Sequence, residues 1–138
     1  MAITQTTCTS FKVELLTGTH DFSSDTFKIA LYTGAATVNA DTTVYTTSNE
    51  VSAAGYTAGG NTLTVSTTPT SSGTIAYVSF SNTSWSSALT ARGALIYNSS
   101  KSNKAVAVLD FGADKTSTST FTVTFPAADA TSAIVRIS

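Results

Sequence analysis

Side chains able to perform acid–base, nucleophilic or metal chemistry are few, because the sequence has one histidine and one cysteine. The histidine, His20, is followed directly by Asp21. Adjacent residues of an extended chain point to opposite sides, so this adjacency does not by itself make a catalytic dyad. A serine nucleophile would need His20 as its base, and the chain has no G-x-S-x-G motif to present one. We therefore interpret His20 as a loop residue that follows the first helix.

The acidic residues are scattered along the chain. A glycosidase needs two carboxyl groups about 5–9.5 Å apart, and the sequence leaves open a polysaccharide-cleaving enzyme that uses Asp110 or Asp114. Asp21 with Asp25, or Asp110 with Asp114, would suit calcium, but no calcium-binding loop motif accompanies them. We interpret these acids as solvated loop carboxylates. One Cys and one His exclude a tetrahedral Cys/His zinc site, and the sequence predicts no enzyme, no metal and no cofactor.

Three further features have structural interpretations. The stretch Gly59-Gly60-Asn61 lacks the Gly-Lys-Ser/Thr of a phosphate loop, and its glycines suit a turn with positive φ. The free thiol of Cys8 is interpreted as a small apolar side chain near the first helix. Trp85 lies among small polar residues between predicted strands. Packing in the core and anchoring a partner both remain open for this tryptophan.

The composition favours a β-rich binding or structural protein. The chain has 138 residues, 11% of them charged, and a net charge of −1, so no basic excess is present for binding nucleic acid. Serine and threonine make up 48 residues, and β-branched threonine favours strands. No apolar run is long enough to span a membrane, and the first residues lack the pattern of a signal peptide. We expect synthesis in the cytoplasm and no membrane contact.

The spacing of apolar residues predicts a short helix followed by strands. Ser10 is expected to cap a helix over 11–16, with Phe11, Leu15 and Leu16 on one face. Segment 34–61 is predicted to be a long connection with at most one short strand near Val44. Apolar clusters of strand length predict strands over 27–33, 62–67, 74–80, 92–98, 105–111, 120–125 and 132–137, with period-two alternation in the first two and burial on both faces expected for 74–80. The fold class is therefore all-β: an antiparallel β-sandwich, jelly-roll or Ig-like, of about seven to eight strands with a short N-terminal helix.

We expect one β-sandwich domain over 1–138, in which residues 1–9 are a candidate flexible arm. Ile3 is the only large apolar side chain of that arm after Met1, so it is a candidate contact for a partner. The alternative is that residues 1–9 pair at the edge of the sheet or cap the sandwich, and contact no other chain.

Several stretches also resemble a family of small virion proteins of tailed bacteriophages, notably short-tailed phages of aquatic hosts. The resemblance covers nearly the whole chain: CTSFKVELLTGTHDF (8–22), TFKIALYTG (26–34), NEVSAAGYTAGG (49–60), LTARGALIYNSSKSNKAVAVLDFG (89–112) and FPAADATSAIVRI (125–137). Its most specific part is ARGALIYNSSKSNKA. The resemblance implies a structural part of the phage particle and carries no catalytic residues.

The leading functional hypothesis is a capsid decoration (cement) protein that stabilises the head by bridging major capsid subunits. We expect self-association as a dimer or trimer and a location in the virion. The alternative is a tail-associated fibre, knob or host-receptor module that contacts tail proteins and binds a glycan through its tyrosines and Trp85. The candidate interface residues are Ile3, Phe11, Tyr45, Tyr56 and Trp85.

Overall fold

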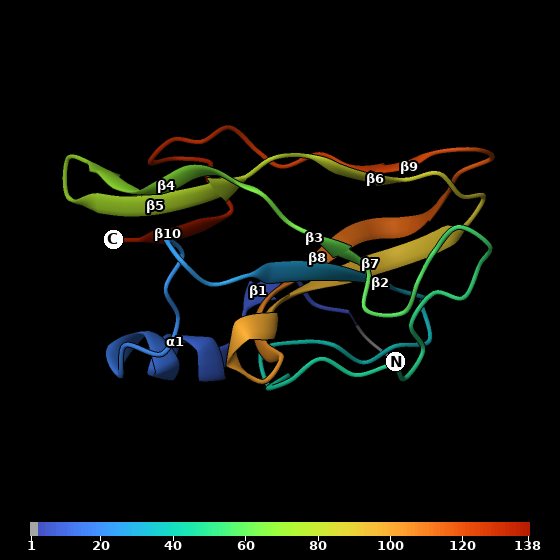
Figure 1. Ribbon diagram of the computed structural model, residues 1–138, viewed down its shortest axis with the longest axis horizontal. Coiled ribbons are helices and arrows are strands. Elements are labelled where there is room, and N and C mark those ends of the chain that lie inside the picture. Colours follow the sequence, from blue (N-terminus) through green and yellow to red (C-terminus); the bar gives the residue numbers. More distant parts are fainter. Residues whose placement is uncertain (1–2) are drawn as a thin grey trace.

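The computed structural model describes residues 3–138, which form two layers of antiparallel β-sheet with a short helix beneath one layer (Figure 1). One layer is a five-stranded sheet of order β1-β8-β7-β2-β3, and the other holds the sheets β10-β5-β4 and β6-β9. The elements are β1 (Thr6–Thr7), α1 (Thr9–Leu16), β2 (Phe27–Tyr32), β3 (Asn61–Thr62), β4 (Val65–Ser72), β5 (Ile75–Phe80), β6 (Thr83–Trp85), β7 (Thr90–Asn98), η1 (Ser99–Lys101), β8 (Lys104–Thr116), β9 (Phe121–Val123) and β10 (Val135–Ile137). The predicted all-β antiparallel fold is confirmed.

The described residues form ten strands, where the sequence predicts seven or eight. The difference comes from short strands: β1 and β3 have two residues each and β6 has three. Strands this short leave no apolar alternation to detect. β8 is longer than predicted, because the ladder with β7 continues past its apolar part to Thr116.

Strands β2, β7 and β8 form the centre of the larger sheet, and both faces of β2, of β7 and of the first half of β8 are largely buried. Residues 33–60 cross one face, where the Tyr45 ring stacks on the Tyr97 ring at 4.7 Å and the Tyr32 hydroxyl donates to the Thr46 carbonyl at 2.6 Å. Both sides of β2 are therefore largely buried, because this long connection covers the side that bears Tyr32.

Aromatic side chains fill the space between the two layers. Phe22 stacks on Phe27 with ring centroids 4.3 Å apart, and both lie against Phe80 of the smaller sheet. Phe80 in turn contacts Phe125 at 5.8 Å. Full burial of such a side chain stabilises a fold by about 1.5–3 kcal/mol, so this row of rings is a principal tie between the layers.

The N-terminal segment is fixed to the domain from Ile3 onward. Ile3 forms a bridge to Val38, its side chain is 9% exposed, and the Thr4 amide donates to the Val38 carbonyl at 3.1 Å. β1 then pairs with β8. This arrangement differs from the expected flexible arm over 1–9 and matches the alternative, pairing at the sheet edge. Residues 1–2 of that arm lie outside the described residues.

Helix α1 begins at Thr9, two residues earlier than the serine cap predicts. Cys8 occupies the N-cap position without a side-chain cap, while the Ser10 hydroxyl is buried without a hydrogen-bond partner in the described chain. Phe11 is fully buried, but Leu16 is 90% exposed, so the predicted shared face is wrong for Leu16. At 100° per residue, Leu16 lies about 140° around the helix from Phe11. Within residues 3–138, no helix has the length and apolarity needed to cross a membrane.

Candidate functional site

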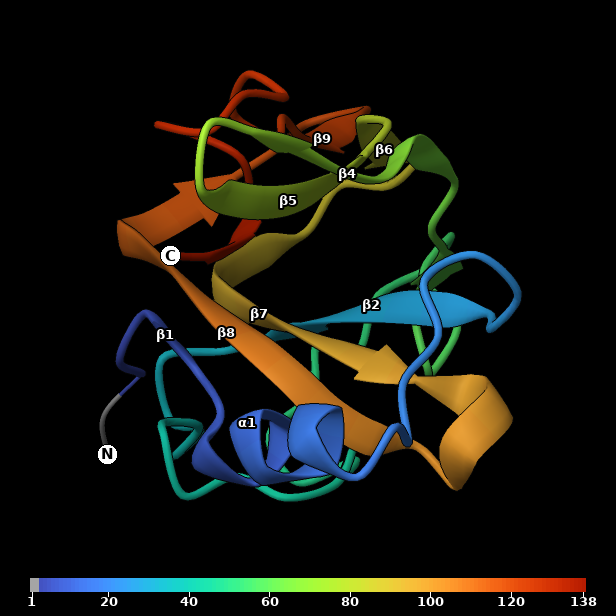
Figure 2. The same cartoon turned by 90° about the vertical axis from the view of Figure 1, so that its left-hand side faces the viewer.

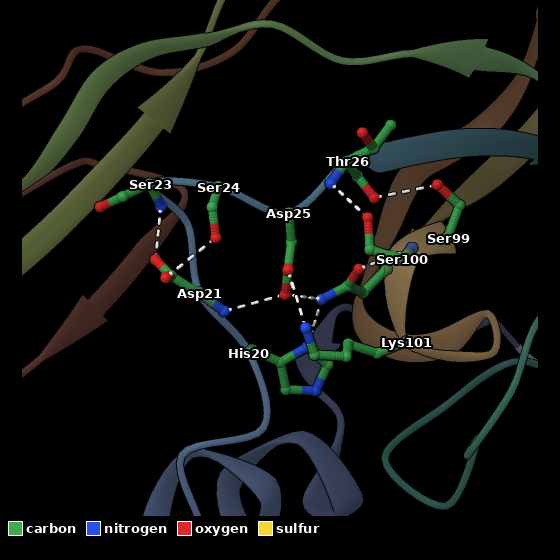
Figure 3. Close-up of polar contacts among 10 residues, drawn as sticks. His20, Asp21, Ser23, Ser24, Asp25, Thr26, Ser99, Ser100 and Lys101 are labelled. Carbon is green, nitrogen blue, oxygen red and sulfur yellow. Dashed lines mark hydrogen bonds and ion pairs between the residues drawn. The ribbon is translucent and has the colours of Figure 1, made fainter.

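The one histidine lies in a buried polar network at the junction of α1, the loop after it and η1 (Figure 3). The His20 side chain has no exposed surface, and its ring lies 4.9 Å from the Phe11 ring. The Nδ2 amide of Asn98 donates to His20 Nδ1 at 3.0 Å, which makes Nδ1 an acceptor and leaves Nε2 as the donor to Glu14 Oε1 at 2.8 Å. Sequence reasoning placed His20 in the loop after the first helix, where the structure has it, but did not predict its burial.

Both ring nitrogens of His20 are occupied by side chains that are not nucleophiles. The carboxylate of Glu14 also approaches the Lys104 ammonium at 3.6 Å, and Asn98 is fully buried. A catalytic base needs a free nitrogen facing a substrate, and neither nitrogen has that freedom. The two hydrogen bonds of His20 connect Glu14 of α1 to Asn98 at the end of β7, so their role is structural.

Asp25 extends the network toward the surface. Its Oδ2 accepts from the Asn98 amide at 2.8 Å and from the Asp21 backbone N–H at 3.0 Å, and its Oδ1 accepts from Lys101 Nζ at 2.9 Å. Burial alone would raise the pKa of Asp25, but the hydrogen bonds from Lys101, Asn98 and Asp21 outweigh it and hold the pKa at about 2. The carboxylate is therefore fixed as an anion that joins the loop after α1 to η1.

A second polar group, partly buried, is centred on Glu50, and we call Tyr32, Tyr45, Tyr56 and Tyr97 around it the tyrosine cluster. The Tyr45 hydroxyl donates to Glu50 Oε1 at 2.6 Å, and the Tyr56 hydroxyl donates to Oε2 at 2.6 Å. The Gly59 amide donates to the same Oε2 at 2.8 Å. Glu50 thereby holds three points of the 33–60 connection together.

The tyrosine cluster has raised pKa values. Burial, together with the nearby Glu50 charge, raises the pKa of Tyr97 to about 12 and those of Tyr32, Tyr45 and Tyr56 further still. The phenols are therefore neutral donors at physiological pH, as their hydrogen bonds require. These side chains hold the connection on the sheet and are committed to partners within the domain.

The remaining acidic candidates do not form a shared site. Asp110 pairs with Arg92 at 3.1 Å, and a backbone hydrogen bond from Gly112 is the main cause that lowers its pKa. Asp21 is exposed, and hydrogen bonds from Ser23 and Ser24 lower its pKa. Across the described residues 3–138, no three His, Cys, Asp or Glu side chains gather as metal ligands would.

Four of the five candidate interface residues are buried in the domain itself. Ile3 is 9%, Phe11 0%, Tyr56 8% and Trp85 4% exposed. Trp85 packs against Tyr56 and Phe121 at ring distances of 5.9 and 6.3 Å. Only Tyr45 keeps part of its side chain at the surface. Their place in the core corrects the expectation that they are exposed, because a side chain packed inside the domain offers no surface to a partner.

An apolar groove lies between α1 and β10, at the end of the molecule that faces the viewer in Figure 2. We call it the α1–β10 groove; its volume is about 410 Å³, and an adjoining hollow of about 310 Å³ shares part of its wall. The groove is lined by Thr7, Phe11, Lys12, Leu15, Leu16, Val135, Arg136, Ile137 and Ser138. Sequence reasoning missed it, since it depends on how the C-terminal strand lies over the helix.

A larger hollow of about 560 Å³ lies along the far half of β8 and β9. Apolar side chains, Phe111 and Phe121 among them, form part of its wall, together with exposed threonines such as Thr120, Thr122 and Thr124. It holds no carboxylate, and its one charged side chain is Lys115. These groups contain no acid–base pair, so the hollow has no constellation for catalysis.

Comparison of the chain with models of protein families, with curated proteins and with solved structures gave no match in any of the three. The resemblance to phage virion proteins therefore stays a prediction from the sequence.

Proposed function

We propose that this protein is a structural component of a tailed-phage virion and acts as a capsid decoration (cement) protein. Its proposed partner is the major capsid protein, whose subunits it would bridge as a dimer or trimer. It would be made in the host cytoplasm and incorporated in the virion. Nucleic acid is not a proposed partner, because the net charge is −1.

One observation carries this proposal above the others. The side chains that could take part in acid–base chemistry, including His20, Asp25 and Glu50, are hydrogen-bonded to partners inside the domain. Apolar side chains on α1 and β10, in contrast, are exposed. A domain with this distribution is suited to binding a surface rather than transforming a substrate. The whole-chain resemblance to virion proteins supports the same class.

The glycan-binding alternative has weaker support. Sugar recognition by stacking needs an exposed aromatic face. Trp85 and Tyr56 are buried, and Tyr45 and Tyr97 stack on each other. Most of the aromatic surface that motivated a receptor-binding module is therefore used within the domain, although Tyr77 keeps part of its side chain at the surface. A tail location without glycan binding stays the alternative hypothesis.

The test of cementing is the stability of the particle. Virions that lack the protein should assemble but lose DNA at a lower temperature or after osmotic shock, and added purified protein should restore resistance. Each contact stabilises by only a few kcal/mol, but many copies act together on one shell. Particles that resist heat and osmotic shock equally well without the protein would argue against this function.

A further inference from the structure

Exposed apolar side chains gather on α1 and β10. Over the described residues, the large apolar side chains with strong exposure are Val13 at 57%, Leu16 at 90%, Val44 at 46% and Ile137 at 53%. Single exposed apolar residues are common on protein surfaces. Here, however, Leu16 and Ile137 both line the α1–β10 groove, whereas Val13 lies on α1 outside the groove wall. Such a gathering beside a groove marks a surface that another chain covers.

The groove also runs beside two unpaired strand edges. β10 is the end strand of the order β10-β5-β4, and β1 is the end strand of the larger sheet. The groove wall includes Thr7 from β1 together with Arg136 and Ile137 from β10. An end strand presents backbone N–H and C=O groups that can pair with an added strand. A strand placed beside β10 would direct alternate side chains toward α1, where Leu15 and Leu16 form the floor.

The charges at the groove indicate which kind of chain it accepts. Lys12 and Arg136 both line it, and neither has a carboxylate ion-pair partner in the described part of the chain. A second copy docked through the same face would bring these two cations against their own copies, which is unfavourable. A segment of a different protein that carries a carboxylate complements them instead.

We propose that the α1–β10 groove binds an extended segment of another protein by strand addition to β10. The segment carries apolar side chains at alternate positions, which lie on Leu15 and Leu16, and an acidic residue that pairs with Lys12 or Arg136. About five residues span the three-residue edge of β10. The main-chain bonds supply affinity, and the side-chain pattern supplies selectivity. The inference stands apart from the virion assignment, since a head or a tail partner could supply the segment.

The test uses the full chain and a synthetic heptapeptide that alternates threonine and valine and carries one glutamate. In an NMR titration, the peptide should bind with a dissociation constant of about 1 mM or tighter. The backbone amide signals of β10 should shift. A peptide with N-methyl groups along one edge cannot form the added ladder from that edge, so one of the two edge-methylated peptides should fail to bind.

Variants on one helix provide matched controls. Leu16→Asp should weaken binding about tenfold or more, because a leucine side chain loses its apolar contact. Val13→Asp, on the same helix but outside the groove wall, should leave affinity within about twofold. Lys12→Glu together with Arg136→Glu should lower the affinity for the glutamate peptide about threefold. The same double variant should bind more tightly a peptide in which lysine replaces the glutamate.

Three results would overturn the proposal. The first is no binding of the glutamate peptide to the wild-type chain in the millimolar range. The second is equal binding by both edge-methylated peptides, which would exclude strand addition. The third is a concentration-dependent dimer that Leu16→Asp abolishes in sedimentation, since the groove would then be occupied by a second copy of the chain.

Discussion

Replacement of Asp25 by asparagine removes the anion that joins the loop after α1 to η1. In the native protein, the Asp25 carboxylate accepts hydrogen bonds from Lys101, Asn98 and the Asp21 backbone. These hold its pKa at about 2, against an ordinary value of 3.8. The difference between the two pKa values is equivalent to at most about 2.5 kcal/mol of stability.

The expected loss in Asp25→Asn is about 1–2 kcal/mol at neutral pH. It is smaller than the upper value because the Lys101 side chain is 38% exposed and solvent screens the pair. Because the folded-state pKa is lowered, the unfolded chain binds the proton first as the pH falls. The contribution of Asp25 is therefore complete above about pH 4 and is lost as the pH falls toward about 2. The variant should lack this part of the acid dependence.

Urea unfolding followed by the fluorescence of Trp85, which is buried, measures both effects at a series of pH values. Asp41→Asn is the matched control, because Asp41 is an exposed carboxylate outside the ion pairs of the described chain. The control should keep the wild-type stability and acid dependence. If Asp25→Asn is as stable as the wild type at neutral pH and loses stability equally in acid, the network does not stabilise the fold as described.

Three further predictions concern the backbone, the thiol and the phenols. Gly60→Ala should prevent folding or lower the free energy of unfolding by more than about 3 kcal/mol, because the added Cβ would overlap the Ile29 carbonyl. Gly73→Ala is the control, since Gly73 also has a positive φ but lies in open space, and it should lower the free energy of unfolding by about 1 kcal/mol in the same urea experiment. Burial raises the pKa of the Cys8 thiol to about 11 from 9.0, so a disulfide reagent should modify the native protein about 100-fold more slowly than the unfolded chain; comparable rates would mean that Cys8 is accessible. The tyrosine cluster should stay un-ionised in an absorbance titration to about pH 11, and Glu50→Gln should lower the onset; an unchanged onset would show that Glu50 does not raise these pKa values.

Strands with local apolar patterns were the predictable part of this fold. The apolar segments at 27–33, 74–80, 92–98 and 105–111 correspond to β2, β5, β7 and β8, because short apolar clusters bounded by turn residues are typical of strands. The connection over 34–61 was also predicted as largely strand-free. Its packing on the sheet was not predictable, since it depends on contacts with distant parts of the chain, such as the stacking of Tyr45 on Tyr97 of β7. Nothing in the local sequence encodes such long-range contacts.

The candidate site was less predictable than the fold for a similar reason. Asn98 bonds His20 and Asp25 across 78 and 73 residues of sequence, so the network exists only after β7 is placed beside the loop that follows α1. The large aromatic side chains of Tyr56 and Trp85 suggested an interface, but a large aromatic side chain also favours burial in the core. Both side chains are buried in the structure. The exposure of Leu16 follows from helix geometry, which puts it away from Phe11.

The proposed capsid decoration, with the α1–β10 groove facing a capsid subunit, can be examined in the assembled particle. Cryo-electron microscopy of the virion is the decisive measurement, because the fold can be placed in density of sufficient detail. We expect density for the chain on the head, repeated with the capsid lattice, with α1 and β10 against a major capsid subunit. Density for the chain on the tail alone, or on the head with α1 and β10 facing solvent, would contradict it.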